Sequence, residues 1–293
     1  PGRYRILVPI QHDSGMENLI RLGARIANVQ SDVSMCLLQV IEPQVAESED
    51  AKEKLQSSRQ YTLEKFIKHA VERNVPMYAK TVTDATPAEG IINEMRNDNN
   101  VRLLLFKWPV GESEQTEFNA TLDPIVRSGL TNVGILFDRG IDRLENILVP
   151  VGGGYHSKFA VQVAESLAKA DNGSVDVVRV VDEELDDEQY EDQMAYLQEI
   201  VIVQLENIPG NMNLHIVRGN DTASAIIEET RQRDYDLVVI GSYEGDTQGE
   251  YLFGELVDRV RRGTSTSVLV VRHYENPAAS WLRRQLRSSN PRT

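Results

Sequence analysis

The sequence Ile6-Leu7-Val8-Pro9-Ile10 recurs as Ile147-Leu148-Val149-Pro150-Val151, 141 residues further along a chain of 293 residues. Each copy is a short, continuous apolar run, which is typical of a strand buried on both faces of a parallel sheet. A segment as long as this shift is close to the usual size of a domain. The repeat therefore predicts two domains of the same fold, at residues 1–141 and 142–275, produced by duplication of a whole domain.

The same alternation of strands and helices follows both copies of this run. Later apolar strands are expected at residues 33–41, 77–82, 103–106 and 133–137, and again at 175–181, 214–217, 237–240 and 268–271. Between them lie helical patterns, including charged helices over residues 51–73 and 188–207. Strands that alternate with helices predict right-handed crossovers and a parallel sheet covered on both faces. We therefore expect an α/β fold in which each half is a five-stranded parallel sheet flanked by helices.

Composition restricts the class of protein. Hydrophobic residues at 41% and charged residues at 26% are ordinary for a folded chain and argue against disorder. The formal net charge of −14 disfavours binding to nucleic acid, because phosphate neutralisation needs clustered Lys and Arg. The single Cys36 excludes a disulfide framework and fits a reducing cytosol. No apolar run reaches 18 residues and no signal peptide precedes the first strand, so we expect a cytoplasmic chain.

The acidic residues and histidines show no pattern of a metal site. Eight of the eleven residues 182–192 are Asp or Glu, a run that is typical of a solvated loop or a helix start. The five histidines fall on different elements without paired spacing. We therefore expect no bound metal.

The carboxyl ends of the second-half strands carry glycine and polar residues. Ligands of open parallel sheets bind at such ends, where the strand order reverses. The residues at these positions are Gly152 and Gly153 after the first strand, Asp182 after the second, and Gly241 and Ser242 after the fourth. Gly254 opens a helix thirteen residues after Gly241, and bare N–H groups at a helix start bind anions, so a phosphate could lie between the two turns. Alternatively, Gly241 allows a sharp strand exit and Gly254 ends a loop.

Five segments of the second half follow one known pattern: residues 147–151, 177–182, 236–242, 252–260 and 267–271. In these segments the second half resembles the universal stress protein family, and the whole chain resembles a tandem universal stress protein, more faintly over residues 4–138. In ATP-binding members of that family, the signature is Gly, two residues, Gly, nine residues, Gly, then Ser or Thr. An Asp after the first strand also holds the nucleotide.

The second half departs from that signature. Gly241 and Gly254 match the outer glycines, but Glu244 takes the middle position and Gly245 follows one step late. Glu255 replaces the Ser or Thr, and its carboxylate at a helix start would repel a triphosphate. The resemblance implies that the residues around these glycines bind a nucleotide cofactor. Because of Glu255, we expect a less charged nucleotide, AMP or a cyclic dinucleotide, to be favoured over ATP.

The first half departs further. Lys107 and Ala120 stand where the outer glycines are expected, and Gln11 stands at the position of the first-strand Asp, as Gly152 does in the second half. We therefore expect at most one ligand site of this type, in the second half. Trp108, beside Lys107, either fills the degenerate first-half pocket or forms an interface.

A basic tail, residues 276–293, follows the second domain and contains Trp281-Leu282-Arg283-Arg284-Gln285-Leu286-Arg287. This amphipathic segment could lie on a membrane surface, dock on the acidic body or stay solvated. Tandem domains with such a tail resemble the cytosolic C-terminal regions of some prokaryotic amino-acid permeases and cation transporters. The start at Pro1 instead of Met agrees with a domain excised from a longer protein at the cytosolic face of a membrane, and a tag cut would give the same start.

Two functions from different classes are consistent with these features. The first is a noncatalytic regulatory module that senses a small ligand or scaffolds a partner such as a membrane transporter domain. Its halves would pack as a pseudo-dimer through residues 133–137 and 268–271, and two chains could form a homodimer. The alternative is a nucleotide-binding enzyme with slow ATP hydrolysis or AMP transfer. That enzyme would need a metal-holding carboxylate, a phosphate-facing Lys or Arg, and hydroxyls at the helix start, so we expect no enzyme.

Overall fold

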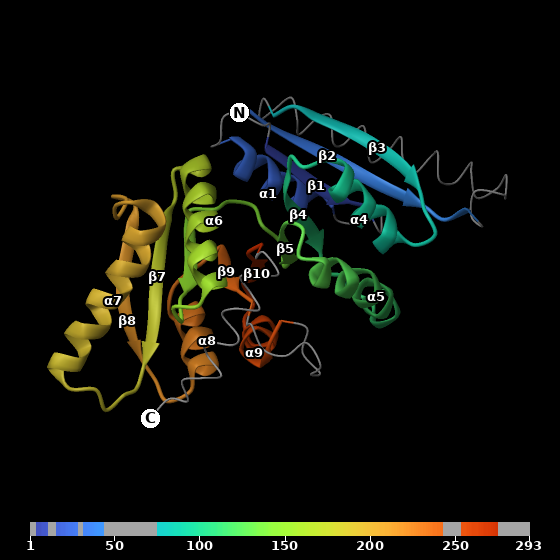
Figure 1. The fold of residues 1–293 in the computed structure, drawn as a ribbon. Helices are drawn as coiled ribbons and strands as arrows, with labels where there is room; N and C mark the ends of the chain where they lie inside the picture. The colour runs from blue at the N-terminus through green and yellow to red at the C-terminus, as the bar shows by residue number, and fades with distance from the viewer. Residues whose placement is uncertain (1–3, 11–15, 29–31, 44–74, 243–252, 275–293) are drawn as a thin grey trace, which may run out of the picture.

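The computed structural model describes residues 4–10, 16–28, 32–43, 75–242 and 253–274 (Figure 1). The first half contains β1 (Tyr4–Pro9), α1 (Glu17–Asn28), β2 (Val33–Ile41), β3 (Met77–Thr83), α4 (Pro87–Asn97), β4 (Val101–Lys107), α5 (Glu112–Ser128) and β5 (Asn132–Phe137). The second half contains β6 (Asn146–Pro150), α6 (Tyr155–Asp171), β7 (Ser174–Val181), α7 (Asp187–Leu205), β8 (Met212–Arg218), α8 (Thr222–Gln232), β9 (Leu237–Gly241), α9 (Glu255–Gly263) and β10 (Ser267–Arg272). The expected helix over 51–73, Gly245 and the tail 276–293 lie outside the described residues.

The ten strands within the described ranges form one sheet, in the order β3-β2-β1-β4-β5-β10-β9-β6-β7-β8. Neighbouring strands are parallel within each half. β5 and β10 pair antiparallel, from Val133 opposite Arg272 to Phe137 opposite Val268. The strand order of one half is thus the mirror of the other about this junction. The predicted α/β fold, with a parallel sheet in each half, is confirmed.

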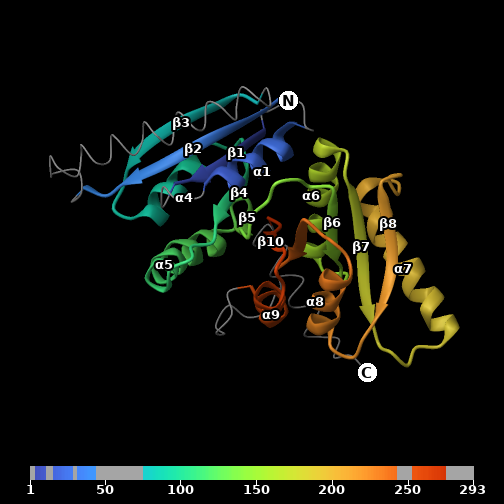
Figure 2. The ribbon, with the colours of Figure 1, turned by 180° about the vertical axis from the view of Figure 1, so that it is seen from behind.

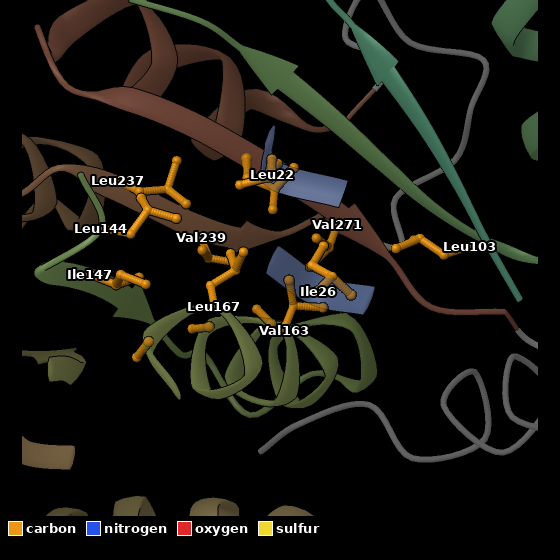
Figure 3. Packing of buried hydrophobic residues seen from close by; sticks show 14 of the residues in the cluster. Leu22, Ile26, Leu103, Leu144, Ile147, Val163, Leu167, Leu237, Val239 and Val271 are labelled. Carbon is orange, nitrogen blue, oxygen red and sulfur yellow. The ribbon is translucent and has the colours of Figure 1, made fainter. Parts of the chain in front are cut away.

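Helices cover both faces of the sheet. α1, α6 and α7 contribute to one buried apolar cluster, which draws strand residues from both halves. α4, α5, α8 and α9 contribute to a second cluster on the other face. Figure 3 shows the first cluster where α1 packs on α6, with Ile26 of α1 beside Val163 of α6 and Val271 of β10. The hydrophobic core is therefore continuous across the junction between the halves.

Local sequence signals fix the ends of several helices. The Thr86 hydroxyl caps α4 by accepting the backbone N–H of Glu89 at 3.2 Å. α7 begins with a capping box, in which Asp186 and Gln189 each accept the other's backbone N–H. α5 is followed by the capping residue Gly129, whose left-handed conformation with φ of 55° suits a residue without a Cβ. Within the described residues, no helix combines the length and apolar character needed to cross a membrane.

A buried ion pair connects α1 to α6 across the junction. Arg25 Nε donates to Asp171 Oδ2 at 2.7 Å, and Arg25 is only 3% exposed. A guanidinium in such a position is costly to bury unless a carboxylate lies close by. The pair therefore ties the two halves together at a point where the apolar core continues from one to the other.

We expect Asp171→Asn to lower the free energy of unfolding by about 3 kcal/mol, because the buried Arg25 guanidinium loses a charged partner. Denaturation of the intact chain in guanidinium chloride measures this loss. Asp123→Asn is the matched control, since Asp123 contacts Arg127 at 2.8 Å on an exposed surface of α5. We expect the control to cost less than about 0.5 kcal/mol. Equal losses in the two variants would contradict a structural role for the pair.

Candidate functional site

The carboxyl ends of β6 and β9 form the switch point of the second half. β6 leads to β7 on one side, whereas β9 lies on its other side, so the strand order reverses between them. The register between β6 and β9 ends at Leu148 opposite Val238. β9 continues to pair with β10 as far as Gly241 opposite Val271. The two strands therefore part before their carboxyl ends, and the start of α6 lies at the end of β9.

Gly241 lets the first turn of α6 lie directly on the end of β9. A Cβ added at Gly241 would be 2.5 Å from the carbonyl carbon of His156 and 2.5 Å from the backbone nitrogen of Ser157. Ser157 Oγ donates to the Gly154 carbonyl at 2.7 Å, so it belongs to the helix start rather than to a free surface. The Gly152–Gly154 turn therefore leads directly into the helix start that lies on Gly241. The glycine therefore has a structural role whether or not a ligand binds.

The helices at this edge begin in two different ways. α7 and α8 have their first-turn N–H groups accepted by Asp186 and Asp221. α6 and α9 begin after Gly154 and Gly254, which have no side chain to accept a hydrogen bond. Gly254 also has φ of 90°, a conformation that favours glycine. The starts of α6 and α9 are thus the two at which an external anion could take the place of a cap.

Ser242, the residue after Gly241, carries a buried hydroxyl. Its backbone N–H donates to the Val271 carbonyl at 2.9 Å, which continues the β9–β10 pairing. The residue is 5% exposed, and its Oγ has no hydrogen-bond partner among the described residues. A buried hydroxyl without a partner costs free energy. A polar ligand that reached it would remove that cost.

The turn after β6 is covered by α7. Gly153 has φ of 86°, and a Cβ there would overlap the hydroxyl of Tyr196. The Arg179 guanidinium lies 4.8 Å from the centre of the Tyr196 ring, and its Nε donates to Gln193 Oε1 at 2.6 Å. Burial lowers the pKa of Arg179 from its ordinary value, and Tyr196 acts in the opposite direction. One cation therefore stacks on the ring whose hydroxyl lies against this glycine turn.

The acidic residues predicted for the site face solvent. Asp182 is exposed, and its Oδ1 accepts the backbone N–H of Glu184 at 2.9 Å, which stabilises the local turn. Glu255 is also exposed, in the first turn of α9, where a carboxylate suits the helix dipole. The structure thus joins Gly152 and Gly153 to Gly241 and Ser242 through the start of α6, and it places Asp182 in a turn of its own.

Two histidines that sequence reasoning did not link meet between the first turn of α6 and the end of β10. His156 is 3% exposed, and its Nδ1 accepts the backbone N–H of His273 at 3.0 Å. The His273 ring stacks on Phe159, with 4.8 Å between centres, and its Nδ1 is 2.7 Å from Asn132 Oδ1 of β5. The contact spans 117 positions, so no local pattern could reveal it. No group of three or more His, Cys, Asp or Glu within the described part of the chain could hold a metal ion.

We expect Gly241→Ala to lower the free energy of unfolding by about 2 kcal/mol, because the new methyl must displace the backbone of α6. Gly152→Ala is the matched control, since a Cβ at Gly152 meets nothing within 4 Å and its φ is not positive. Thermal and denaturant unfolding of both variants without ligand measure the difference. A Gly241→Ala chain as stable as the control would show that α6 does not rest on β9 in this way.

The comparisons with known proteins agree with this architecture. Residues 143–272 match the model of the Universal stress protein family. A universal stress protein from Archaeoglobus fulgidus DSM 4304 is 14% identical, with 91% of this chain and 97% of that chain covered and a TM-score of 0.60. A functionally unknown protein from Pseudomonas aeruginosa PAO1 is 13% identical, with 98% of each chain covered and a TM-score of 0.56. The comparison with curated proteins finds no match.

The two solved structures share the fold of this chain over nearly its whole length. The family model covers the half that carries the glycine turns and the buried Ser242 hydroxyl. Residues 143–272 are therefore the part of the chain that is similar to the universal stress protein family.

Proposed function

We propose that the second half binds a small phosphate-bearing ligand without turning it over, and that the chain is a tandem regulatory module. The observation that carries this proposal is the buried Ser242 hydroxyl, which has no partner among the described residues. It lies next to Gly241, on which the start of α6 rests. A phosphate oxygen can accept from a hydroxyl and from backbone N–H groups of a helix start at the same time.

The charges around the site favour a ligand with few phosphates. Arg179 supplies one cation, on the Tyr196 ring that covers the glycine turn. Arg259 is held by Asp221, with Nη1 and Oδ1 2.8 Å apart, and Arg262 Nε is 2.9 Å from Asp258 Oδ2. Glu255 adds a negative charge at the start of α9. A triphosphate would therefore meet weaker attraction than a nucleoside monophosphate or a cyclic dinucleotide would.

The same contacts argue for binding without catalysis. Phosphoryl transfer relies on Lys or Arg directed at the phosphates and on carboxylates that hold a metal. In α9, Arg259 and Arg262 are instead directed at Asp221 and Asp258. A ligand held by backbone N–H groups and one hydroxyl would be bound without being changed. Its presence or absence would then be the signal. The resemblance to cytosolic regions of transporters extends the proposal to regulation of such a partner.

Calorimetry with ATP, ADP, AMP and cyclic dinucleotides tests this function. We expect AMP or a cyclic dinucleotide to bind more tightly than ATP, and Ser242→Ala to weaken that binding about tenfold through loss of one hydrogen bond. Without ligand, Ser242→Ala should be at least as stable as wild type, because it removes an unpaired buried hydroxyl. Thr264→Val is the control, since the Thr264 hydroxyl is 2.9 Å from that of Thr230 and its loss should destabilise the chain. Micromolar binding of ATP with measurable hydrolysis would contradict the proposal.

We expect Glu255→Ser to raise the affinity for ATP about tenfold, because it removes the carboxylate from the helix start that the phosphates approach. Glu112→Ser is the matched control, since Glu112 also begins a helix directly after a glycine cap, in the first half. Titration calorimetry at low and high salt measures both variants. If ATP affinity is unchanged in Glu255→Ser, or rises equally in Glu112→Ser, repulsion by Glu255 is not what disfavours ATP.

A further inference from the structure

Aromatic side chains from the first half hold the residue that precedes α9. Trp108 follows β4, and its ring stacks on Phe137 of β5, with 4.9 Å between centres. Phe253, the residue before Gly254, packs its ring edge-on against both, at 6.1 Å from Trp108 and 6.5 Å from Phe137. Phe118 of α5 completes the cluster at 5.1 Å from Trp108. Phe253 is 7% exposed, so its side chain is buried at the junction of the halves.

The other end of α9 is held from the same side. The Arg261 guanidinium lies 5.3 Å from the centre of the Trp108 ring and 5.0 Å from that of Phe137. Arg139, in the segment that joins the halves, donates to the Arg261 carbonyl. The backbone N–H of Arg139 also donates to Ser267 Oγ at 2.9 Å. Both views of the ribbon place α9 between α5 of the first half and α8 of the second (Figure 2).

α9 needs such support because it is short. It has nine residues, and isolated helices of that length are marginal in water. Its cap Gly254 has φ of 90°, in a residue type that loses much conformational freedom when it is ordered. Contacts that fix Phe253 therefore also fix the adjacent Gly254 and the direction of the first-turn N–H groups.

We infer that Trp108 is a positioning residue for the ligand site of the second half. It acts through Phe253, and with Phe137 it sets where Gly254 and the start of α9 lie. The effect of Trp108 on ligand binding rests on the proposed function. Its effect on the position of α9 does not depend on a ligand. The half without a ligand site of its own thus contributes to the site of the other half.

The duplication supports this assignment. Leu122 of α5 corresponds to Leu256 of α9, a shift of 134 residues, and the same shift carries Trp108 onto Ser242. At equivalent strand ends, one half therefore has a ring that reaches across the junction, and the other has the buried hydroxyl. Two interpretations of Trp108 were open: it fills a space in its own half, or it forms an interface. The structure shows contacts of both kinds, with Phe118 of the same half and with Phe253 of the other.

Amide hydrogen exchange of the intact chain, combined with calorimetry with AMP, tests the inference. In Trp108→Ala we expect the α9 amides to exchange about tenfold faster and AMP affinity to fall about tenfold, the change expected when a ring contact is lost. Trp108→Phe keeps a ring and should restore most of both properties. Met95→Ala is the control, since Met95 is buried in α4 of the same half and on the same face. Met95→Ala should lower the melting temperature but leave the exchange of the α9 amides and the AMP affinity unchanged. If the Trp108→Ala chain folds poorly, Phe253→Leu tests the same contact from its other side. It should give the same two changes.

Unchanged exchange of α9 in Trp108→Ala and Phe253→Leu would overturn the inference, as would equal acceleration in Met95→Ala. Faster exchange with unchanged AMP affinity would overturn the positioning role. A wild-type chain that binds no nucleotide would overturn the proposed function instead. The exchange arm uses no ligand, so it would still decide whether Trp108 holds α9.

Discussion

An edge strand exposes a row of unpaired backbone N–H and C=O groups, and each half of this chain would expose such an edge at its last strand. The antiparallel pairing of β5 with β10 covers both edges at once. It also aligns the halves so that α1 packs on α6 and the apolar core continues across the junction. The Arg25–Asp171 pair and the ring contact between Trp108 and Phe253 both depend on that alignment. One backbone constraint therefore determines which side chains of the two halves can meet.

The strands and helices could be predicted because their signal is local. Runs such as 147–151 and 237–240 are apolar at every position, and a strand buried on both faces needs this whatever surrounds it. The site could be predicted only in outline. Gly241 was identified from its place after a strand, but its packing role depends on the backbone of His156, 85 positions away. The burial of the Ser242 hydroxyl and the contact between Trp108 and Phe253 likewise arise from distant segments, so no spacing in the sequence reports them.

The polar contacts of β3 with α4 and of β8 with α8 show how the copies diverged. In the first half, Lys80 of β3 is 2.6 Å from the buried Glu94 of α4. In the second half, His215 of β8 is 3.2 Å from the equivalent Glu229 of α8. Asp176, which occupies the register position of Cys36, accepts hydrogen bonds from Asn213, Arg233 and Tyr235. Burial acts to raise the pKa of Asp176, but these hydrogen bonds and charges lower it overall. Both copies thus keep a buried carboxylate on the same helix while its partners change.

Divergence at the carboxyl ends has a different consequence, because there the two copies are no longer independent. Lys107 and Trp108 stand where the second half has Gly241 and Ser242, and the Lys107 ammonium lies 3.6 Å from Asp138. A Cβ at the Gly241 position would meet the start of α6, so the Lys107 side chain at the equivalent position does not suit a helix start of that kind. At this strand end the first half therefore has a ring that contacts Phe253 and Arg261 of the second half, where the second half has a glycine and a buried hydroxyl. Two identical domains would carry the same residue at this strand end. They could therefore have the ring at both ends or the hydroxyl at both ends, but not one of each. Duplication within one chain permits the asymmetry, since each copy can carry a different residue at the same strand end.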